Sequence, residues 1–434
     1  MTEDVKKLIQ AARSALLGSG AQEETLLKFD SVVNRRKFLG TGGLLGLTLA
    51  SDGVVQRVFG EGLIPTAWAD TEVEGKPGMQ VHNDRPVNGE FAPHMLHDSV
   101  TPTSRHFIRN NGLVPPMATK MDATGWTLTI DGEVKKKLTL TLADLKKMGS
   151  ETYSLLIECG GNGRALFDPP VRGNPWGRGA VSCSQWTGVP LKDILQRAGI
   201  KDTAIYTAHY GADIPLGKAA PFSRGIPIEK AMEEHTLVAY KMNGKDIPPH
   251  HGFPVRLVVP GWVGSCSQKW LNKITLLNKV HDSPKMTGYS YRVPKYDPVP
   301  GVRPPKEDME IATAWKIKSM ITSPQVGTTI GKPSTIEVEG HAWAGENEVD
   351  KVEISIDYGA NWLETDLKSP ANKYAWQRFK AKVPFPRKGY YEVWARATDE
   401  EGRSQPFQQA WNPKGYLGNV MHRIPIYVGV DSHG

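Results

Sequence analysis

The sequence predicts two folded parts, an α+β domain followed by an all-β domain. Before residue 284, short strands and short amphipathic helices are mixed without regular alternation, which is typical of an α+β arrangement. Residues 284–305 are rich in proline and indicate a linker. After the linker, apolar residues alternate with period two between turn residues, which predicts a β-sandwich.

Three segments support the α+β prediction. A short alternating strand begins at Trp126 and ends at an Asp-Gly turn. A helix capped by Thr141 is expected next, followed by a strand that ends at Cys159. Residues 191–198 fit an amphipathic helix that ends at Gly199. This mixture argues against a doubly wound sheet.

The C-terminal part is expected to be an immunoglobulin-like sandwich of about 100 residues. Its alternating runs begin at Ile336, Val352 and Tyr391. Alone, such a module would be interpreted as a binding or dimerisation domain. We therefore expect a first domain over residues 70–305 and a sandwich domain over residues 306–434.

Composition restricts the class of protein. The chain has 434 residues, enough for two or three domains, and a net charge of +7 from 53 Lys and Arg against 46 Asp and Glu. The basic residues are spread out, so we expect an anionic substrate or an acidic protein partner and no nucleic acid. Three cysteines, Cys159, Cys183 and Cys266, are too few and too widely spaced for a disulfide framework.

The N-terminal segment, residues 1–69, reads as a twin-arginine signal and leader. Asn34-Arg35-Arg36-Lys37 precedes an apolar stretch over residues 38–50, and Ala67-Trp68-Ala69 is a cleavage candidate. The apolar stretch is shorter than the roughly 20 residues that a membrane span needs. A basic amphipathic helix is the alternative, and the stretch before Asn34 is long enough that translation can start further along. The signal predicts export to the periplasm in the folded state, as for proteins that receive a cofactor in the cytoplasm.

Residues 155–164 are the most informative stretch of the chain. An apolar strand stops at Cys159, two glycines and an Asn-Gly pair allow a turn, and Arg164 follows. A thiolate at a strand end beside a cation suits a soft metal or a nucleophile. A buried, inert cysteine before a turn is the alternative interpretation.

Four further segments carry side chains suited to chemistry. They are residues 107–116, 174–177, 250–270 and 411–423. The third combines cations with glycine-exposed amides, which suits a phosphate group. Its paired histidines, His250 and His251, can also mark an ordinary turn or a zinc site, although no second pair of zinc-spaced ligands follows.

With the Cys159 stretch, these segments resemble the sulfite oxidase family over nearly all of residues 90–434. Within that family, the chain resembles bacterial periplasmic sulfite dehydrogenases and the molybdenum subunits of sulfane dehydrogenases. The resemblance implies that Cys159 binds molybdenum. It also implies that the molybdopterin is held by Phe107, Arg109, Asn110, Asn111, His251, Arg256, Ser267, Gln268 and Lys269.

The resemblance further implies a catalytic pocket for an oxyanion. Its residues here would be Arg109, Arg164, Trp176, Tyr291 and Lys414. Tyr291 fits the pocket tyrosine better than Tyr289. Two positions depart from the family pattern: Asn111 replaces a histidine, and Lys414 replaces an arginine. At position 414 the positive charge remains, but the planar contact of a guanidinium with an oxyanion is lost.

The implied activity is molybdenum-dependent oxidation of sulfite to sulfate by oxo transfer. Because the chain has no Cys-x-x-Cys-His motif, we expect no haem in it and a separate c-type cytochrome as electron acceptor. The second domain resembles the family's dimerisation domain, which implies a homodimer. Two alternatives remain: the molybdenum subunit of a sulfane dehydrogenase in thiosulfate oxidation, and an exported β-sandwich binding protein without redox activity. The family's methionine sulfoxide reductases fit less well because they lack the sandwich.

Overall fold

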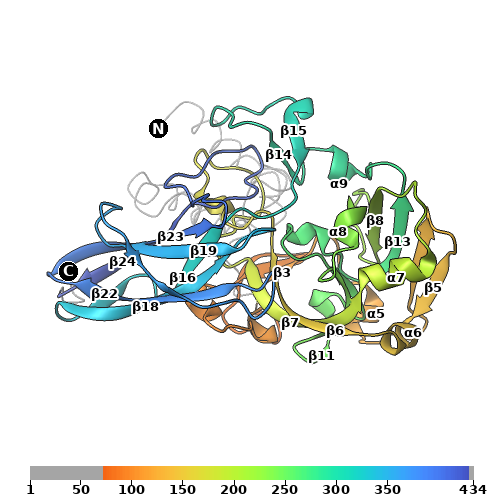
Figure 1. Cartoon of the computed structure of the whole chain (residues 1–434), viewed down its shortest axis with the longest axis horizontal. Helices are drawn as coiled ribbons and strands as arrows, with labels where there is room; N and C mark the ends of the chain where they lie inside the picture. The colour runs from red at the N-terminus through yellow and green to blue at the C-terminus, as the bar shows by residue number, and fades with distance from the viewer. Residues whose placement is uncertain (1–71, 430–434) are drawn as a thin grey trace, which may run out of the picture. The chain divides into compact units, whose positions relative to one another are not determined.

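The computed structural model describes residues 72–429, all within one compact unit. The predicted twin-arginine signal and cleavage site lie outside these residues. No helix of the described part has the length and apolar character needed to cross a membrane. Figure 1 shows the sheets of the C-terminal part beside those of the first domain.

The first domain contains a mixed five-stranded sheet in the order β5-β4-β13-β8-β9. Its central strand β13 runs parallel to β4 and antiparallel to β8. Helix α6 begins after Thr141. The side chains of Thr141 and Asp144 each accept a hydrogen bond from the other residue's backbone amide, which forms a capping box at the start of the helix. The strands are β4 (Thr127–Gly132), β5 (Leu138–Thr141), β8 (Tyr206–Gly211), β9 (Ser223–Pro227) and β13 (Leu271–Leu277).

A second five-stranded sheet has the order β11-β10-β7-β6, with β12 also paired to β10. Strand β6 ends at Glu158, opposite Val181 of β7. One apolar cluster joins the two sheets with helix α7, which ends at Gly199 as expected. The strands are β6 (Glu151–Glu158), β7 (Val181–Pro190), β10 (Leu237–Met242), β11 (Lys245–Asp246) and β12 (Arg256–Val258).

Short elements complete the first domain and the linker. Strands β1 (Gln80–Asp84), β2 (Val87–Glu90) and β3 (Ile108–Arg109) form a small sheet, and β14 (Arg292–Pro294) pairs with β15 (Met309–Ile311) across the proline-rich linker. The helices are α5 (Pro116–Thr119), α6 (Leu142–Lys147), α7 (Leu191–Ala198), α8 (Ile228–Ala231) and α9 (Pro284–Thr287). The 3₁₀ turns are η1 (Pro93–Leu96), η2 (Thr103–Arg105), η3 (Arg164–Leu166), η4 (Pro249–His251), η5 (Gly264–Cys266) and η6 (Lys306–Asp308).

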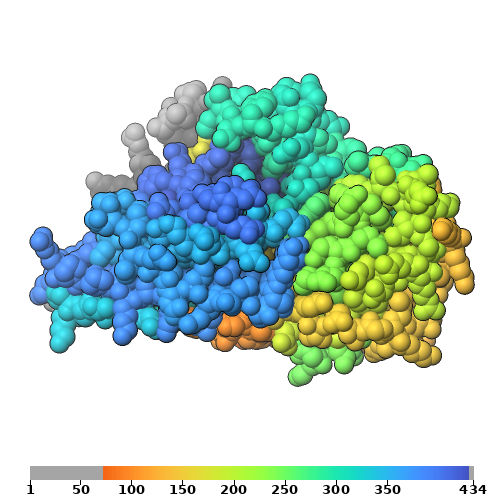
Figure 2. All heavy atoms as spheres, viewed as in Figure 1, coloured from red at the N-terminus to blue at the C-terminus, as the bar shows by residue number. Residues whose placement is uncertain are grey.

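The C-terminal part is mostly β and forms two sheets that share one apolar cluster. In β22 burial alternates residue by residue, as the period-two pattern predicted. One sheet has β16 (Lys318–Ser323), β18 (Ser334–Trp343), β22 (Gln377–Phe385) and β21 (Asp366–Leu367). The other has β17 (Thr328–Ile330), β24 (His422–Val428), β23 (Gly389–Asp399), β19 (Val349–Ser355) and β20 (Leu363–Glu364). In the space-filling view these segments adjoin the first domain directly (Figure 2).

Candidate functional site

A partly open cavity lies at the C-terminal end of strand β6. Most of the predicted site residues line it, although they come from distant parts of the chain. They are Phe107, Arg109, Asn111, Cys159, His251, Arg256, Ser267, Gln268, Lys269 and Tyr291.

Cys159 follows β6 directly and its side chain reaches this cavity, with 9% of the residue exposed. Its thiol is near enough to the Arg109 guanidinium to raise the pKa of that group. The turn after it favours glycine, since a Cβ at Gly161 would lie only 2.2 Å from the guanidinium of Arg164 and would displace that side chain. The cysteine is therefore beside a cation and open to the cavity, as a metal ligand or nucleophile requires.

Arg109, Asn111 and Tyr291 form a hydrogen-bonded group beside the thiol. The Asn111 Oδ1 atom accepts from Arg109 Nη2 at 2.7 Å and from Tyr291 Oη at 3.0 Å. Burial opposes the charge of Arg109, but Tyr291 and Cys159 outweigh it and raise its pKa, so the guanidinium is charged. Asn111 thus holds both side chains in place.

The opposite side of the cavity is cationic. Arg256 donates to the carbonyl oxygens of His251 and Ser267, both at 3.0 Å. Lys269 donates to the His250 carbonyl at 2.7 Å and to the side chain of Asn110, which does not itself line the cavity. Burial lowers the pKa of Arg256 to about 9, and burial with the Arg256 charge holds the pKa of Lys269 far below its usual value. These cations have too little negative charge around them.

Four residues near this group were not predicted from the sequence. Lys76 donates to the His106 carbonyl at 2.8 Å and lies 2.7 Å from His251 Nε2, and burial lowers its pKa to about 7. Among the described residues that line the cavity, Asp213 is the one with a carboxylate, and burial raises its pKa. His106 also lines the cavity. Lys76 and Asp213 lie in none of the motif segments, so only the folded chain reveals them, whereas His106 directly precedes the segment over residues 107–116.

Three predicted catalytic residues lie outside the cavity lining. Trp176 is fully buried, with its ring edge-on to His82 at 4.8 Å between centroids. Arg164 donates to the Lys414 and Asn174 carbonyls, both at 3.0 Å, so its guanidinium supports the backbone.

Lys414 is half-buried among other cations, and burial together with Arg303 and Arg164 lowers its pKa. The ring of Tyr416, the fourth residue missed, lies between this cation group and the cavity. It is 5.2 Å from Arg164 and stacks on Tyr291 at 5.5 Å.

The cavity fits a molybdopterin with a phosphate group. Gln268 Oε1 and Ser265 Oγ are buried at its wall without a hydrogen-bond partner, and such atoms are costly unless a ligand satisfies them. The excess of buried cations suits an anionic group, and the thiol suits a soft metal. Within residues 72–429, no three His, Cys, Asp or Glu side chains are grouped to hold a metal, so the paired histidines have no zinc ligand set there.

Two family descriptions match the chain. Residues 114–285 match the oxidoreductase molybdopterin binding domain. Residues 309–429 match the Mo-co oxidoreductase dimerisation domain. Both agree with the order of domains in the fold.

Individual relatives match most of the chain. Mitochondrial sulfite oxidase of Rattus norvegicus is 33% identical over 373 residues, covering 81% of this chain and 66% of the relative, just under two thirds of its length. Mitochondrial sulfite oxidase of Drosophila melanogaster is 32% identical over 97% of this chain and 74% of its own. A nitrate reductase (NADH) of Ulva prolifera is 30% identical over 84% of this chain but 45% of its own.

Among solved structures, the sulfane dehydrogenase SoxCD from Paracoccus pantotrophus aligns with a TM-score of 0.67 and 25% identity. The alignment covers 83% of this chain and 86% of that one. The fold, the cavity and these matches agree, and the chain belongs to the sulfite oxidase family of molybdenum oxidoreductases.

Proposed function

We propose that the protein oxidises sulfite to sulfate at the cavity beside Cys159. The observation that carries this proposal is that the Cys159 thiol and the Arg109 guanidinium share one cavity. Cys159 would bind the metal. Ser267, Gln268, Lys269, Arg256 and His251 would hold the pterin and its phosphate. When bound, the molybdenum cofactor supplies oxygen-atom transfer and accepts the two electrons of the oxidation.

The chain's own residues bind and orient the oxyanion. Arg109 is held by Asn111 with its charge close to the thiol. Two unit charges 4 Å apart attract by about 4 kcal/mol at an effective dielectric of 20, enough to concentrate a dianion. The Tyr291 hydroxyl lies 3.3 Å from Arg109 Nη2 and can turn its proton from Asn111 to a substrate oxygen. Positioning and preorganised charge are therefore the protein's part in the reaction.

Sulfane-sulfur oxidation is the second candidate, and the alignment with a sulfane dehydrogenase supports it. The similarity to a nitrate reductase makes nitrate reduction a third reaction to assay. We further propose export to the periplasm by the twin-arginine route, a c-type cytochrome as acceptor, no haem in this chain, and a homodimer. The match to a dimerisation domain supports the homodimer. The two sheets sharing one cluster support an immunoglobulin-like class for residues 306–434.

The test is steady-state turnover of protein from a host that makes the cofactor, with molybdenum content measured alongside. Sulfite with cytochrome c should be oxidised, and Cys159→Ser should reduce this to background. Cys183→Ala is the matched control, because Cys183 is fully buried and lines no part of this cavity. Unchanged turnover in Cys159→Ser would overturn the mechanism. Turnover of sulfane sulfur or nitrate but not sulfite would replace the proposed substrate, and folded protein without molybdenum would favour a binding module.

A further inference from the structure

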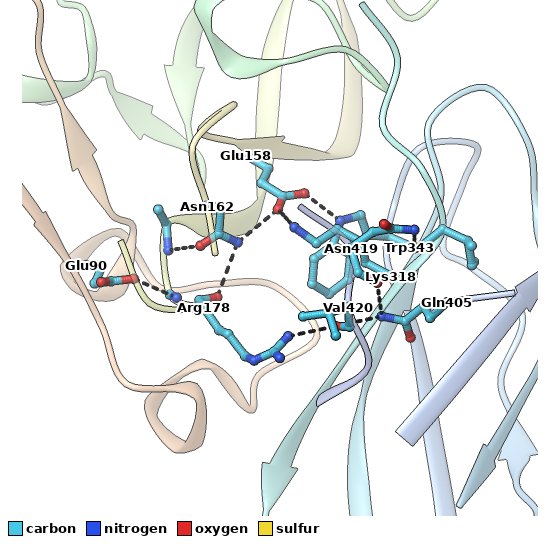
Figure 3. A network of polar contacts seen from close by, with 12 residues as sticks. Glu90, Glu158, Asn162, Arg178, Lys318, Trp343, Gln405, Asn419 and Val420 are labelled. Carbon is cyan, nitrogen blue, oxygen red and sulfur yellow. Dashed lines mark hydrogen bonds and ion pairs between the residues drawn. The ribbon is translucent and has the colours of Figure 1, made fainter. Parts of the chain in front are cut away.

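Glu158, the residue before Cys159, is a buried carboxylate that the reaction does not use. None of its surface is exposed. Its Oε1 atom accepts from Asn162 Nδ2 at 2.9 Å and from Lys318 Nζ, and its Oε2 atom accepts from Trp343 Nε1 at 2.7 Å. Figure 3 shows these three donors converging on the carboxylate. A buried carboxylate is tolerated only with such partners.

Two of the three donors belong to the C-terminal domain. Lys318 begins β16 and Trp343 ends β18, and the two residues are direct cross-strand partners. Their spacing is therefore set by the sheet. Lys318 and Trp343 therefore hold the end of β6 through buried hydrogen bonds from a different domain.

The side chains of β6 alternate between two environments at this point. Ile157 and Cys159 line the cavity, whereas Glu158 between them faces Lys318 and Trp343 (Figure 3). Consecutive side chains of a strand point to opposite sides. Holding the Glu158 carboxylate therefore fixes the direction in which the next side chain, the thiol, enters the cavity.

The turn after Cys159 is tied to the same network. Asn162 donates to Glu158 while its Oδ1 atom accepts from the Ala180 amide at 3.1 Å, and the Asn162 amide donates to the Cys159 carbonyl at 2.7 Å. The Leu417 amide, from the C-terminal domain, donates to the Gly160 carbonyl at 3.0 Å. Both sides of the thiol are thus held by residues that depend on the second domain.

We propose that Glu158, Lys318 and Trp343 are positioning residues for the Cys159 thiol, and that the C-terminal domain is a structural part of the metal site. This role rests on the proposed function only in taking Cys159 as the metal ligand. It predicts that loosening the network changes the freedom of the thiol before any metal is bound.

The test is the alkylation rate of Cys159 in full-length, cofactor-free protein, followed by mass spectrometry of its peptide. In Lys318→Met the alkylation rate of Cys159 should rise about tenfold. A tenfold change corresponds to a decrease of roughly 1.4 kcal/mol in the free energy of local opening. Cys183 and Cys266 are fully buried and report global unfolding in the same sample. The double variant Glu158→Gln/Lys318→Met removes both charges, so its Cys159 alkylation rate should fall most of the way back to the wild-type rate.

A matched control comes from another cluster that joins the domains. Lys230 of α8 lies 2.9 Å from Glu346 Oε1, and Tyr374 Oη donates to Glu346 Oε2 at 2.8 Å. None of the three lines the cavity. Lys230→Met should therefore lower the melting temperature without changing Cys159 alkylation.

Three results would overturn the positioning role. They are a wild-type alkylation rate in Lys318→Met, an equal acceleration in Lys230→Met, and acceleration of all three cysteines together. If Lys318→Met does not fold, Trp343→Phe takes its place, because it keeps an aromatic ring and removes only the hydrogen bond to Glu158. Cys159 alkylation should then rise severalfold, and a wild-type rate rejects the role. Molybdenum content of the wild type is measured separately, so failure of the proposed function is distinguishable from failure of this role.

Discussion

Two groups of buried charges lie on opposite sides of the end of β6, and they differ in how those charges are balanced. On one side, the Glu158 carboxylate is met by Lys318, Asn162 and Trp343. On the other, Arg256 and Lys76 are buried and Lys269 is partly buried at or near the cavity, with Asp213 as the nearby carboxylate. Burial lowers the pKa of each of these cations, as it does for Lys318, but here no carboxylate of the described residues forms an ion pair with them. In the first group each charge has an opposite charge in contact, so removing one partner leaves the other buried and unpaired, whereas the second group has an excess of positive charge that an anionic ligand would neutralise.

The Lys318→Met and Lys269→Met variants should change the stability of the cofactor-free protein in different ways. Removing Lys318 leaves Glu158 charged and buried, which costs about 3–5 kcal/mol of unfolding free energy. Removing Lys269 deletes an unbalanced cation, so the cofactor-free protein should be equally or more stable. Denaturant titration of both variants without cofactor measures the difference.

The same pair should differ again once cofactor is present. A hydrogen bond to a charged group contributes about 1.5–3 kcal/mol, so Lys269→Met should weaken retention of the pterin by roughly one to two orders of magnitude. Retention is measured as molybdenum and pterin remaining after dialysis. A destabilised cofactor-free Lys269→Met with normal retention would show that Lys269 is a structural residue.

The pH dependence of stability sharpens the comparison at Lys76. Burial lowers the pKa of Lys76 from 10.5 to about 7 in the folded protein. Between those values the unfolded chain binds more protons, so stability rises with pH from about 7 towards 10. The titratable groups around Lys76 are His251, His106, His250 and, through charge, Lys269.

Thermal unfolding of cofactor-free protein at pH 7 and pH 9 tests this. The melting temperature should be higher at pH 9 in the wild type, and this increase should shrink in Lys76→Met. Bound cofactor should also reduce the increase in melting temperature, because an anion beside the Lys76 ammonium group raises the pKa of Lys76 towards its usual value. An unchanged pH slope in Lys76→Met would exclude Lys76 as its source.

Local patterns were sufficient to predict some features and not others. The turn after Cys159 was predictable because its glycines have a steric reason: the Arg164 guanidinium occupies the space where a Cβ at Gly161 would lie. Period-two burial made the C-terminal strands predictable in the same way. By contrast, β13 pairs in parallel with β4, about 140 residues earlier in the chain, and no local pattern encodes that pairing.

The same distinction applies to the site. Cys159, Arg109 and Lys269 were found because each lies in a motif. Lys76 comes from a loop and contacts His251, a residue of the cavity lining, as well as two backbone carbonyls, and any exposed lysine in a loop looks the same in sequence. For Arg164, the resemblance implies substrate binding; in the fold its Nε and Nη1 atoms donate to the Lys414 and Asn174 carbonyls, and the residue lies outside the cavity lining.

The smallest expected effect concerns Lys414, which lies outside the cavity among Arg164, Arg303, Arg172 and Lys285. A half-exposed cation contributes about 0.2–1 kcal/mol, so Lys414→Met should lower kcat/KM for sulfite by roughly two- to fivefold at low salt. Raising the ionic strength should remove that difference, because this group acts through its field on the approaching anion. Lys414→Arg keeps the charge and should match the wild type. A large fall in KM in Lys414→Arg, unaffected by salt, would instead mean that this side chain reaches the bound oxyanion and that the ring of Tyr416 moves aside during turnover.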